Sequence, residues 1–533
     1  MAIENSTVTG WSNATIGSVA TSDIASLTTT QVKTIATSAV SGLTEAQFTA
    51  LSTRQIEALT AEQIVGLIET QIAYMGVKVA ALGTAQVAAL EVADIDNLTT
   101  QQMVALITRQ FAALTTAQVA ALTTLQLASI ETRDIAAIGT AQLAALTTAQ
   151  LSALDTKQIA AVQTNQAAAL TTSQISSLTT TQLSAIETAD LAAMTTAQIS
   201  NLSTAQVSAL TTRQVEGLTT AQVAALSTAQ VAGLDTKQIA ALSTRQAAVL
   251  TAAQVQNLST AQVAAIETAD LAAMTTAQIS NLSTAQVSAL TTRQVEGLTT
   301  AQVANLSTAQ IQALNSGQLA SMNSGQLVQL TNVQVGFIGT AAITGVDLID
   351  LAAMTTAQLS GLSTAQVSSL TTRQVEGLTS TQVASLSTAQ LSNLTVSQIA
   401  ALETRDLVEI DTTRLDDLTT AQIASLTTRQ VTSLTTAQVA ALSTAQVSAF
   451  DTKQVAALNT TQSSALTAAQ VQNLSTAQVA AIETADLAAM TTAQISNLST
   501  AQVSVLTTRQ IEGLTSTQVD SLSTAQLSNL TVG

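Results

Sequence analysis

The chain has 533 residues, of which only 9% are charged, and its formal net charge is −17. It contains no cysteine and no histidine, so disulfides, thiolate chemistry and metal sites built on these residues are excluded. Aromatic residues make up 1% of the chain and no cluster of basic residues is present, which argues against a nucleic-acid partner. No run of about 18 apolar residues occurs, so we expect no transmembrane helix.

A large aliphatic residue, here called the anchor, recurs at every eighth position of the chain. One series runs from Leu82 to Leu530, and an earlier series runs from Ile3 to Met75 with the same spacing. One residue is lost between Met75 and Leu82. A period held over the whole chain predicts one small structural unit stacked many times.

Each eight-residue repeat, or octad, carries the signals of a helix start. Its consensus is L-[ST]-T-x-Q-[VI]-x-x, in which position two is a good N-cap and the glutamine three residues later completes a capping box, as in Ser203 and Gln206. The anchor Leu202 and Val207 are spaced as a hydrophobic staple. Glycine at position eight, as in Gly217, is typical of a left-handed helix end. We therefore predict an all-α fold, a solenoid of very short helices with one helix per eight-residue repeat.

The alternative is a β-solenoid with sixteen-residue coils, two octads to a coil. Threonine and valine favour strands, and glutamine can form stacked ladders. The chain also lacks proline, which is common at the first position of a helix. Either that backbone N–H is needed for bonding between repeats, or the helix prediction is wrong. Abundant alanine and glutamine favour helices.

Departures from the consensus define the domain organisation. Residues 1–26 are atypical N-terminal octads that we expect to act as an end adaptor. Residues 27–533 form a continuous octad-repeat solenoid, with a one-residue slip at 75–82 that should bend or offset the array. An irregular segment near 332–350 lacks the glutamine pattern, and we expect a surface loop or a lateral contact there.

A long block of sequence begins at Ile186 and again at Ile266, and a close relative begins at Ile482. Gene duplication explains this, and the alternative is that ten octads match a structural repeat of an assembly. Within the blocks, arginine and glutamate recur three residues apart. We expect them to form exposed ion pairs on a helix, each of which stabilises the helix by a few tenths of a kcal/mol. The alternative is a contact between subunits. The pairs that we include among the assembly candidates are Arg213 with Glu216 and Arg293 with Glu296.

One segment is locally acidic and supplies the candidate metal ligands. Oxygen-rich clusters can hold calcium. The candidates are Glu403, Asp406, Glu409, Asp411, Asp416 and Asp417. Because no glycine turn typical of calcium loops is present and Arg405 and Arg414 interrupt the cluster, we favour a solvated face. No other cofactor is expected.

The anchors continue close to both ends of the sequence. The first are Ile3 and Trp11, and Leu530 is followed by Val532. Solenoids usually close with polar, atypical caps. We therefore expect these four residues to take part in head-to-tail contacts between copies of the chain, and a contact that does not close into a ring gives a filament. Lateral contacts are a second expectation.

The runs LTTAQVAALSTAQVSA and LTTAQVAALTTLQLASI resemble the octad arrays of large bacterial secreted or surface proteins, often labelled haem-utilisation or adhesion proteins. The resemblance covers nearly the whole chain. It implies a place outside the cell or on its surface, reached by a type I-like route without a cleaved N-terminal signal. The N-terminal sequence MAIENSTVTGW agrees, because it has no basic region and no apolar region.

Three functions are compatible with these features. The first is a structural protein that self-assembles into an extracellular filament, sheath or surface layer on a bacterial cell. The second is a repeat-surface binding protein, such as an adhesin or an ice- or glycan-binding protein, and the third is an intracellular scaffold. We expect no enzyme, because the chain has no G-x-S-x-G, no phosphate loop and no histidine base.

Overall fold

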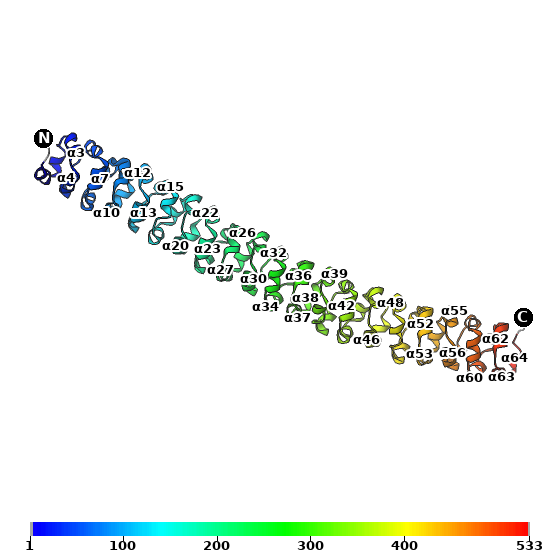
Figure 1. Ribbon diagram of the computed structural model, residues 1–533. Coiled ribbons are helices and arrows are strands. Elements are labelled where there is room, and N and C mark those ends of the chain that lie inside the picture. Colours follow the sequence, from blue (N-terminus) through cyan, green and yellow to red (C-terminus); the bar gives the residue numbers. More distant parts are fainter. Residues whose placement is uncertain (1–3, 531–533) are drawn as a thin grey trace. The chain divides into compact units, whose positions relative to one another are not determined.

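The computed structural model describes residues 4–530, and its regular elements are helices (Figure 1). The described residues contain 64 α-helices and two 3-10 helices, and no strand. The prediction of an all-α solenoid is confirmed, and the alternative β-solenoid is wrong.

Every α-helix begins at the third position of its octad and has four to six residues. From α10 (Thr84–Ala89) to α64 (Thr524–Leu527) this start never shifts, and only the octad that begins at Ile338 has no α-helix. The nine helices before the slip follow the same rule. They are α1 (Asn5–Thr9), α2 (Asn13–Ile16), α3 (Thr21–Ser26), α4 (Thr29–Thr34), α5 (Thr37–Val40), α6 (Glu45–Ala50), α7 (Thr53–Ala58), α8 (Ala61–Val65) and α9 (Glu69–Tyr74).

The capping box starts these helices as the sequence predicts. In α25 (Thr204–Ser208), the Gln206 N–H donates to Ser203 Oγ at 3.2 Å, and the Ser203 N–H donates to Gln206 Oε1 at 2.8 Å. Both side chains of the predicted staple, Leu202 and Val207, are buried. The octad therefore satisfies two of the unpaired N–H groups of its own helix start.

The helix ends differ from the prediction, because no left-handed residue is used. Gly217 is the last residue of α26 (Thr212–Gly217), and the chain leaves this helix through Leu218 at φ −60° and ψ 141°. The Leu218 N–H donates to the Val215 carbonyl at 3.2 Å. Because the extended anchor itself closes the turn, a left-handed glycine is unnecessary. Among the described residues only Gly76 has a positive φ, at 51°.

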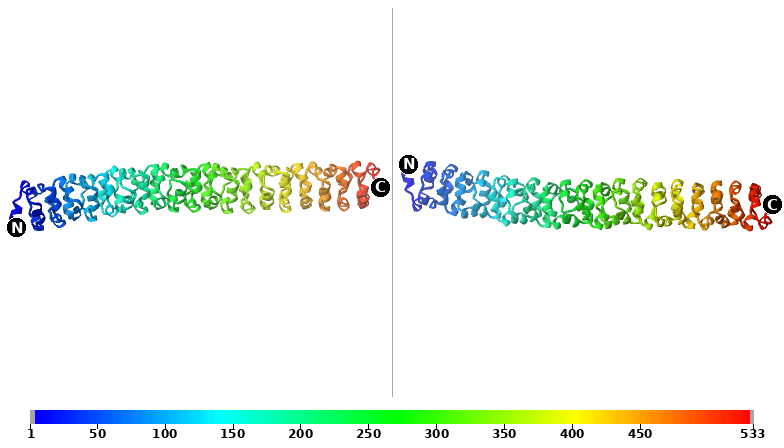
Figure 2. Two further views of the ribbon diagram at one scale, coloured as in Figure 1. Left: turned by 90° about the horizontal axis from the view of Figure 1, so that it is seen from above. Right: turned by 90° about the horizontal axis from the view of Figure 1, so that it is seen from below.

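Three octads make one turn of the solenoid, here called a coil. Each helix packs against the helix three positions further along, as α20 (Thr164–Ala169) does on α23 (Thr188–Ala193) and α24 (Thr196–Ser200) on α27 (Thr220–Ala225). The anchors and the aliphatic residues of position six point inward and form the core, whereas positions two to four are mostly exposed. The successive coils are visible from both sides in Figure 2.

The chain divides into two compact units, Met1–Ile266 and Glu267–Gly533. Each unit is a stack in which the helices of one coil contact those of the coils before and after it. The atypical N-terminal octads belong to the first stack, where α1 packs on α4 and α2 packs on α5. Each unit also contains one irregular octad.

The two irregular octads form 3-10 helices within the stacks. In the first unit, η1 (Gly76–Ala81) takes up the lost residue at the slip, with Gly76 in the left-handed conformation that a side chain disfavours. In the second unit, η2 (Ile343–Gly345) lies between α41 (Asn332–Gly336) and α42 (Leu348–Ala353). The segment near 332–350 therefore continues the stack instead of forming a loop.

Hydrogen bonding between repeats does not explain why the chain lacks proline. In the described part of the chain, the N–H of octad position three makes no hydrogen bond to another repeat. None of the described helices is long enough to cross a bilayer, since each has at most six residues.

Gly345 tests how tightly the irregular octad is packed. A Cβ atom on Gly345 would collide with the main chain of Ser316 in α39 (Ser316–Ala320). We expect Gly345→Ala to lower the free energy of local opening by about 1–3 kcal/mol, measured by hydrogen exchange of α39 and η2. A Cβ on Gly339 would meet its nearest neighbour, Ala342 Cβ, at an ordinary 3.6 Å, so Gly339→Ala should cost less than about 1 kcal/mol. Equal effects of the two substitutions would contradict close packing at Gly345.

Candidate functional site: the glutamine ladder and the acidic coils

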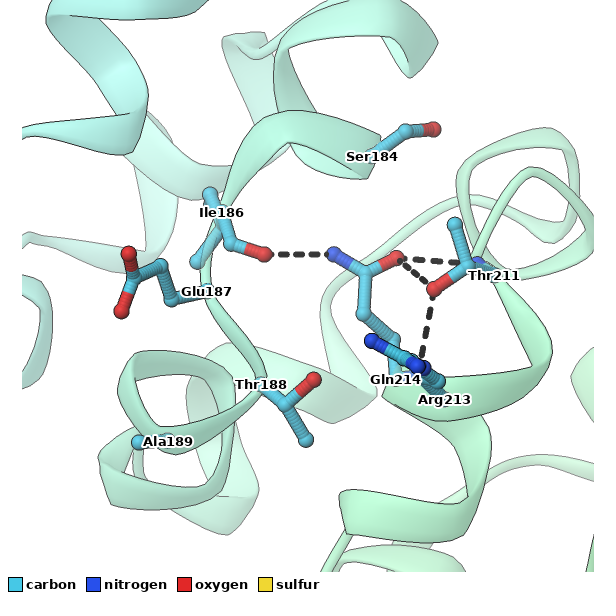
Figure 3. A pocket seen from close by; sticks show the side chains of 8 residues that line it. All are labelled: Ser184, Ile186, Glu187, Thr188, Ala189, Thr211, Arg213 and Gln214. Carbon is cyan, nitrogen blue, oxygen red and sulfur yellow. Dashed lines mark hydrogen bonds between the residues drawn. The ribbon is translucent and has the colours of Figure 1, made fainter.

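The glutamine of octad position five is buried and uses both ends of its amide. Gln214 Oε1 accepts from the Thr211 N–H at 2.9 Å, which is the capping box. Its Nε2 donates to the Leu183 carbonyl at 2.9 Å and to the Ile186 carbonyl at 2.8 Å, both in the preceding coil, and Figure 3 shows the bond to Ile186. One side chain thus starts its own helix and bonds its coil to the one before it.

The same bonds recur along both units and form what we call the glutamine ladder. The carbonyls lie 31 and 28 residues earlier in sequence, at position six and at the next anchor, as for Gln430 with Ile399 and Leu402. These carbonyls lie where a short helix ends, and buried carbonyls there need a donor. The ladder supplies that donor and links successive coils.

Two octads replace the glutamine by a basic residue that keeps the donor. At the slip, Lys78 Nζ donates to the carbonyls of Thr49 and Leu51 at 2.5 and 2.7 Å. In α50 (Thr412–Asp416), an Arg414 guanidinium N–H donates to the Leu386 carbonyl at 2.8 Å, and its Nε donates to Asp411 Oδ2 at 2.6 Å. Arginine has no acceptor for the capping box, so only the other half of the box is made, in which the Arg414 backbone N–H donates to the carboxylate of Asp411.

Seven octads carry a buried aspartate in place of the glutamine. An ionised carboxylate accepts hydrogen bonds but donates none, so these acidic coils lack the ladder donor. The seven are Asp94, Asp134, Asp190, Asp270, Asp350, Asp406 and Asp486. Each is preceded three residues earlier by another acid at the N-cap position.

Some of these carboxylates accept a hydroxyl hydrogen bond from the preceding coil. Thr108 Oγ1 donates to Asp134 Oδ1 at 2.7 Å, and Thr164 Oγ1 donates to Asp190 Oδ1 at 2.6 Å. Ser380 Oγ donates to Asp406 Oδ1 at 2.6 Å, whereas Asp406 Oδ2 is buried without a partner. The hydroxyl group of octad position three thus offsets part of the free-energy cost of burying the carboxylate.

Burial raises the pKa of several of these carboxyl groups. Desolvation is the largest cause for Asp94, Asp134 and Asp406. Desolvation, with the neighbouring charge of Glu483, raises the pKa of Asp486 to about 6. For Asp134 and Asp406 the hydroxyl bond and an adjacent arginine act against the rise.

A shallow pocket lies where an acidic coil meets the next coil. It has a volume of about 430 Å³, and its lining includes Glu187 and Thr188 from one coil and Arg213 from the next (Figure 3). A second pocket of about 430 Å³ has Glu403 and Arg429 at the equivalent positions, together with Glu376. The pockets place a carboxylate and a guanidinium group in one hollow at equivalent octad positions.

The sequence repeats this arrangement in other coils. In six of the seven acidic octads, a basic residue follows the N-cap acid by 26 residues, the separation between the Glu187 and Arg213 positions of the pocket. The six pairs are Glu131 with Lys157, Glu187 with Arg213, Glu267 with Arg293, Asp347 with Arg373, Glu403 with Arg429, and Glu483 with Arg509. The octad of Asp94 is the exception, because Ala117 occupies the equivalent position.

The candidate calcium ligands do not come together in the structure. Glu403 pairs with Arg405 at 2.7 Å, Asp411 pairs with Arg414 at 2.6 Å, and Asp406 is buried. The remaining three, Glu409, Asp416 and Asp417, are exposed. Within residues 4–530 no three acidic side chains are placed to hold a metal ion. A calcium site in this segment therefore stays a prediction without a geometric counterpart.

The assembly candidates are placed as follows. Ile3 and Val532 lie outside the described residues, and Trp11 and Leu530 are half-buried. The exposed candidates are Arg213, Glu216, Arg293 and Glu296. In the described part of the chain no ion pair within 4.0 Å joins Arg213 to Glu216 or Arg293 to Glu296. Their side chains are free to face solvent or a partner.

The second role of the glutamine could have been found in the sequence. A capping box needs only an acceptor at this position, and glutamate supplies one as well as glutamine does. Yet no octad has glutamate at position five, and lysine or arginine replaces glutamine at Lys78 and Arg414. The absence of glutamate indicates that the amide N–H groups are used, and the shorter aspartate marks the octads that lack this donor.

These features define the class as an α-solenoid with one helix per octad, three helices per coil, and coils joined by buried side-chain amides. A family model described as the ALTTAQ repeat matches more than half of the chain, and residues 113–118 spell that hexapeptide. The chain belongs to the ALTTAQ repeat family. The matches cover residues 87–124, 127–164, 183–220, 209–236, 216–244, 223–260, 263–300, 296–332, 348–380, 399–436, 433–460, 439–476 and 479–516. A comparison with curated proteins finds no match.

Removing one rung tests the ladder. Gln430→Leu would leave the Leu402 carbonyl and the Thr427 N–H without their partner, whereas the Ile399 carbonyl would still accept from the Leu402 N–H. Since each unpaired buried group costs about 1–3 kcal/mol, we expect a loss of at least about 2 kcal/mol in local opening free energy, measured by hydrogen exchange. The control is Gln472→Leu, because Gln472 is exposed at octad position seven. A loss below about 1 kcal/mol for Gln430→Leu would refute the stabilising role of the ladder.

Proposed function

We propose that this repeat protein is a structural protein that self-assembles into an extracellular filament, sheath or surface layer on a bacterial cell. The observation that carries the proposal is the glutamine ladder. It gives each coil hydrogen bonds to the coil before it, so the stack does not depend on the small core of one octad alone. Such a stack is suited to bear load or to serve as a building element.

The composition of the outer surface supports the same proposal. Octad positions two to four are mostly exposed, and in most octads they carry threonine, serine or alanine. Only 9% of the residues are charged, so little repulsion opposes the approach of a second copy. A weak contact that recurs at many coils becomes strong through multivalency. Assembly therefore requires no specialised interface.

The proposal includes a location and excludes catalysis. We place the protein outside the cell or on its surface, exported without a cleaved N-terminal signal by a type I-like route. The resemblance to octad arrays of bacterial secreted and surface proteins supports this location. We assign no enzymatic activity and no resident cofactor.

A second candidate is a repeat-surface binding protein such as an adhesin. The observation in its favour is the shallow pocket with Glu187 and Arg213, which has an equivalent at Glu403 and Arg429. Paired opposite charges in a hollow suit polar ligands that carry both donors and acceptors, such as glycans. Binding of purified protein to a glycan array, lost in Arg213→Ala with Arg429→Ala, would favour this candidate.

Electron microscopy with negative staining tests self-assembly directly. We expect the purified full chain to form filaments or sheets as its concentration rises, and sedimentation to show polymers that are in equilibrium with smaller species. A protein that stays monomeric at every concentration, with and without calcium, while its circular dichroism remains helical would contradict the proposal.

A surface variant separates assembly from folding. Ala197, Ala205 and Ala221 are exposed at octad position four. Replacing all three by glutamate adds repulsion between copies, whereas glutamate remains a good helix former. We expect weaker polymerisation with unchanged circular dichroism, and restoration of polymerisation at high salt. The matched control carries glutamine at the same three positions and should polymerise like the unchanged chain.

A further inference from the structure

Asp94 occupies a ladder position in a surrounding that differs from the other acidic coils. It lies in α11 (Val92–Asp96), where its side chain is 3% exposed. Its Oδ2 accepts from the Glu91 N–H at 2.9 Å, which is the bond that a glutamine Oε1 makes in a regular octad. The carboxyl group therefore occupies the place of the ladder amide.

The acceptor that a glutamine would bond lies in the preceding coil. Gln86, which lies one octad before Asp94, donates to the Leu59 carbonyl. One octad further along, a glutamine in place of Asp94 would therefore donate to the Leu67 carbonyl. Leu67 and Asp94 line the same pocket of about 400 Å³. In the described part of the chain the Leu67 carbonyl receives no hydrogen bond. A donor is thus missing where the ladder requires one.

The charged groups beside Asp94 are acidic. Glu91, the N-cap of its helix, and Glu69 of α9, which packs on it, line the same pocket, and the other titratable residues of these two helices are Asp96 and Tyr74. The other helix packed on it, α14 (Thr116–Ala121), has no titratable side chain.

No basic residue offsets these charges. Asp94 lacks the basic residue of the next coil that the other acidic octads have, because Ala117 stands there. It also lacks the hydroxyl donor of Asp134 and Asp190, because Glu69 occupies the equivalent position in the preceding coil.

We propose that Asp94 is a proton-binding site whose neutral carboxyl group takes the place of the ladder amide. When it is protonated, its O–H donates to the Leu67 carbonyl or to the adjacent Glu69 carboxylate, and this bond joins the coil of Asp94 to the preceding coil. When it is ionised, the carboxylates of Glu69, Glu91 and Asp94 line one pocket, no group there donates to the Leu67 carbonyl, and the coil loosens. The site makes this part of the solenoid more stable against local opening in acid than at neutral pH.

Proton binding accounts for the site better than a metal ion does. Among the described residues no acidic cluster has the geometry to hold a metal ion, and a proton needs no cavity. Burial, together with the charges of Glu91 and Glu69, raises the pKa of Asp94. A carboxyl group whose pKa is higher in the folded state stabilises the fold below its unfolded pKa, and this stabilisation is lost as the pH rises through the folded value.

Hydrogen exchange of peptides that cover residues 64–98 tests the proposal in the full chain. After correction for intrinsic exchange, we expect protection to fall as the pH rises from 4.0 to 7.5, by up to about tenfold for each unit by which the folded pKa exceeds the unfolded pKa. Asp94→Asn supplies a neutral donor at every pH, so protection at pH 7.5 should rise to the value at pH 4.0. Equal protection of the unchanged protein at both pH values would overturn the proposal.

Three further measurements keep the test specific. Glu69→Gln removes one neighbouring charge from an exposed position, and should move the midpoint of the protection change to lower pH even if Asp94→Asn folds poorly. Asp190→Asn is the matched buried control, because Asp190 already accepts from Thr164, and it should leave the pH dependence of residues 64–98 unchanged. Calcium at pH 7.5 should also leave protection unchanged. A rise in protection with calcium would show a metal site and overturn the proposal.

Discussion

The structure depends on one hydrogen bond, the donation of a glutamine amide to the backbone carbonyls of the preceding coil. Helices of four to six residues are too short to be stable alone in water. Each also buries carbonyls at its end that have no partner within the helix. The glutamine solves both problems, since its oxygen fixes the start of its own helix and its nitrogen satisfies the end of another. The core of anchors and position-six residues can then remain small.

This double use explains which substitutions the chain accepts. Positions two to four are mostly exposed and vary mainly among small residues, but position two caps the helix and position three can donate to a buried aspartate. Position five varies little, and most changes there keep the donor or the acceptor, whereas Ala39 and Ala342 keep neither. Lys78 and Arg414 keep the donor and lose the acceptor, and Asp411 pairs with the charge of Arg414. The buried aspartates keep an acceptor and lose the donor, so each is a point where the ladder depends on hydroxyl groups, neighbouring charges or protonation.

The sequence predicts the helices but not how they stack. Ser203, Gln206 and the anchor Leu202 determine where a helix begins, because capping boxes and staples are local. The number of octads in a coil follows from packing between residues far apart in sequence, and one anchor per octad is compatible with two or three octads per coil. The prediction of left-handed helix ends was wrong for a related reason. Gly217 fits the preference for glycine there, yet the extended anchor Leu218 closes the turn.

The three-octad coil also changes the meaning of the longer repeat. Ten octads are three coils and one further helix, so octads that lie eighty residues apart fall on different sides of a stack. Within the second unit, Arg293 and Arg373 are related in this way. Within this unit the charged pairs are therefore distributed around the stack instead of being aligned in one stripe. A flat binding surface needs alignment, whereas contacts with several neighbours in a sheet or bundle need similar groups on more than one side. Duplication in units of ten octads thus favours the assembling protein over the one-sided binding module.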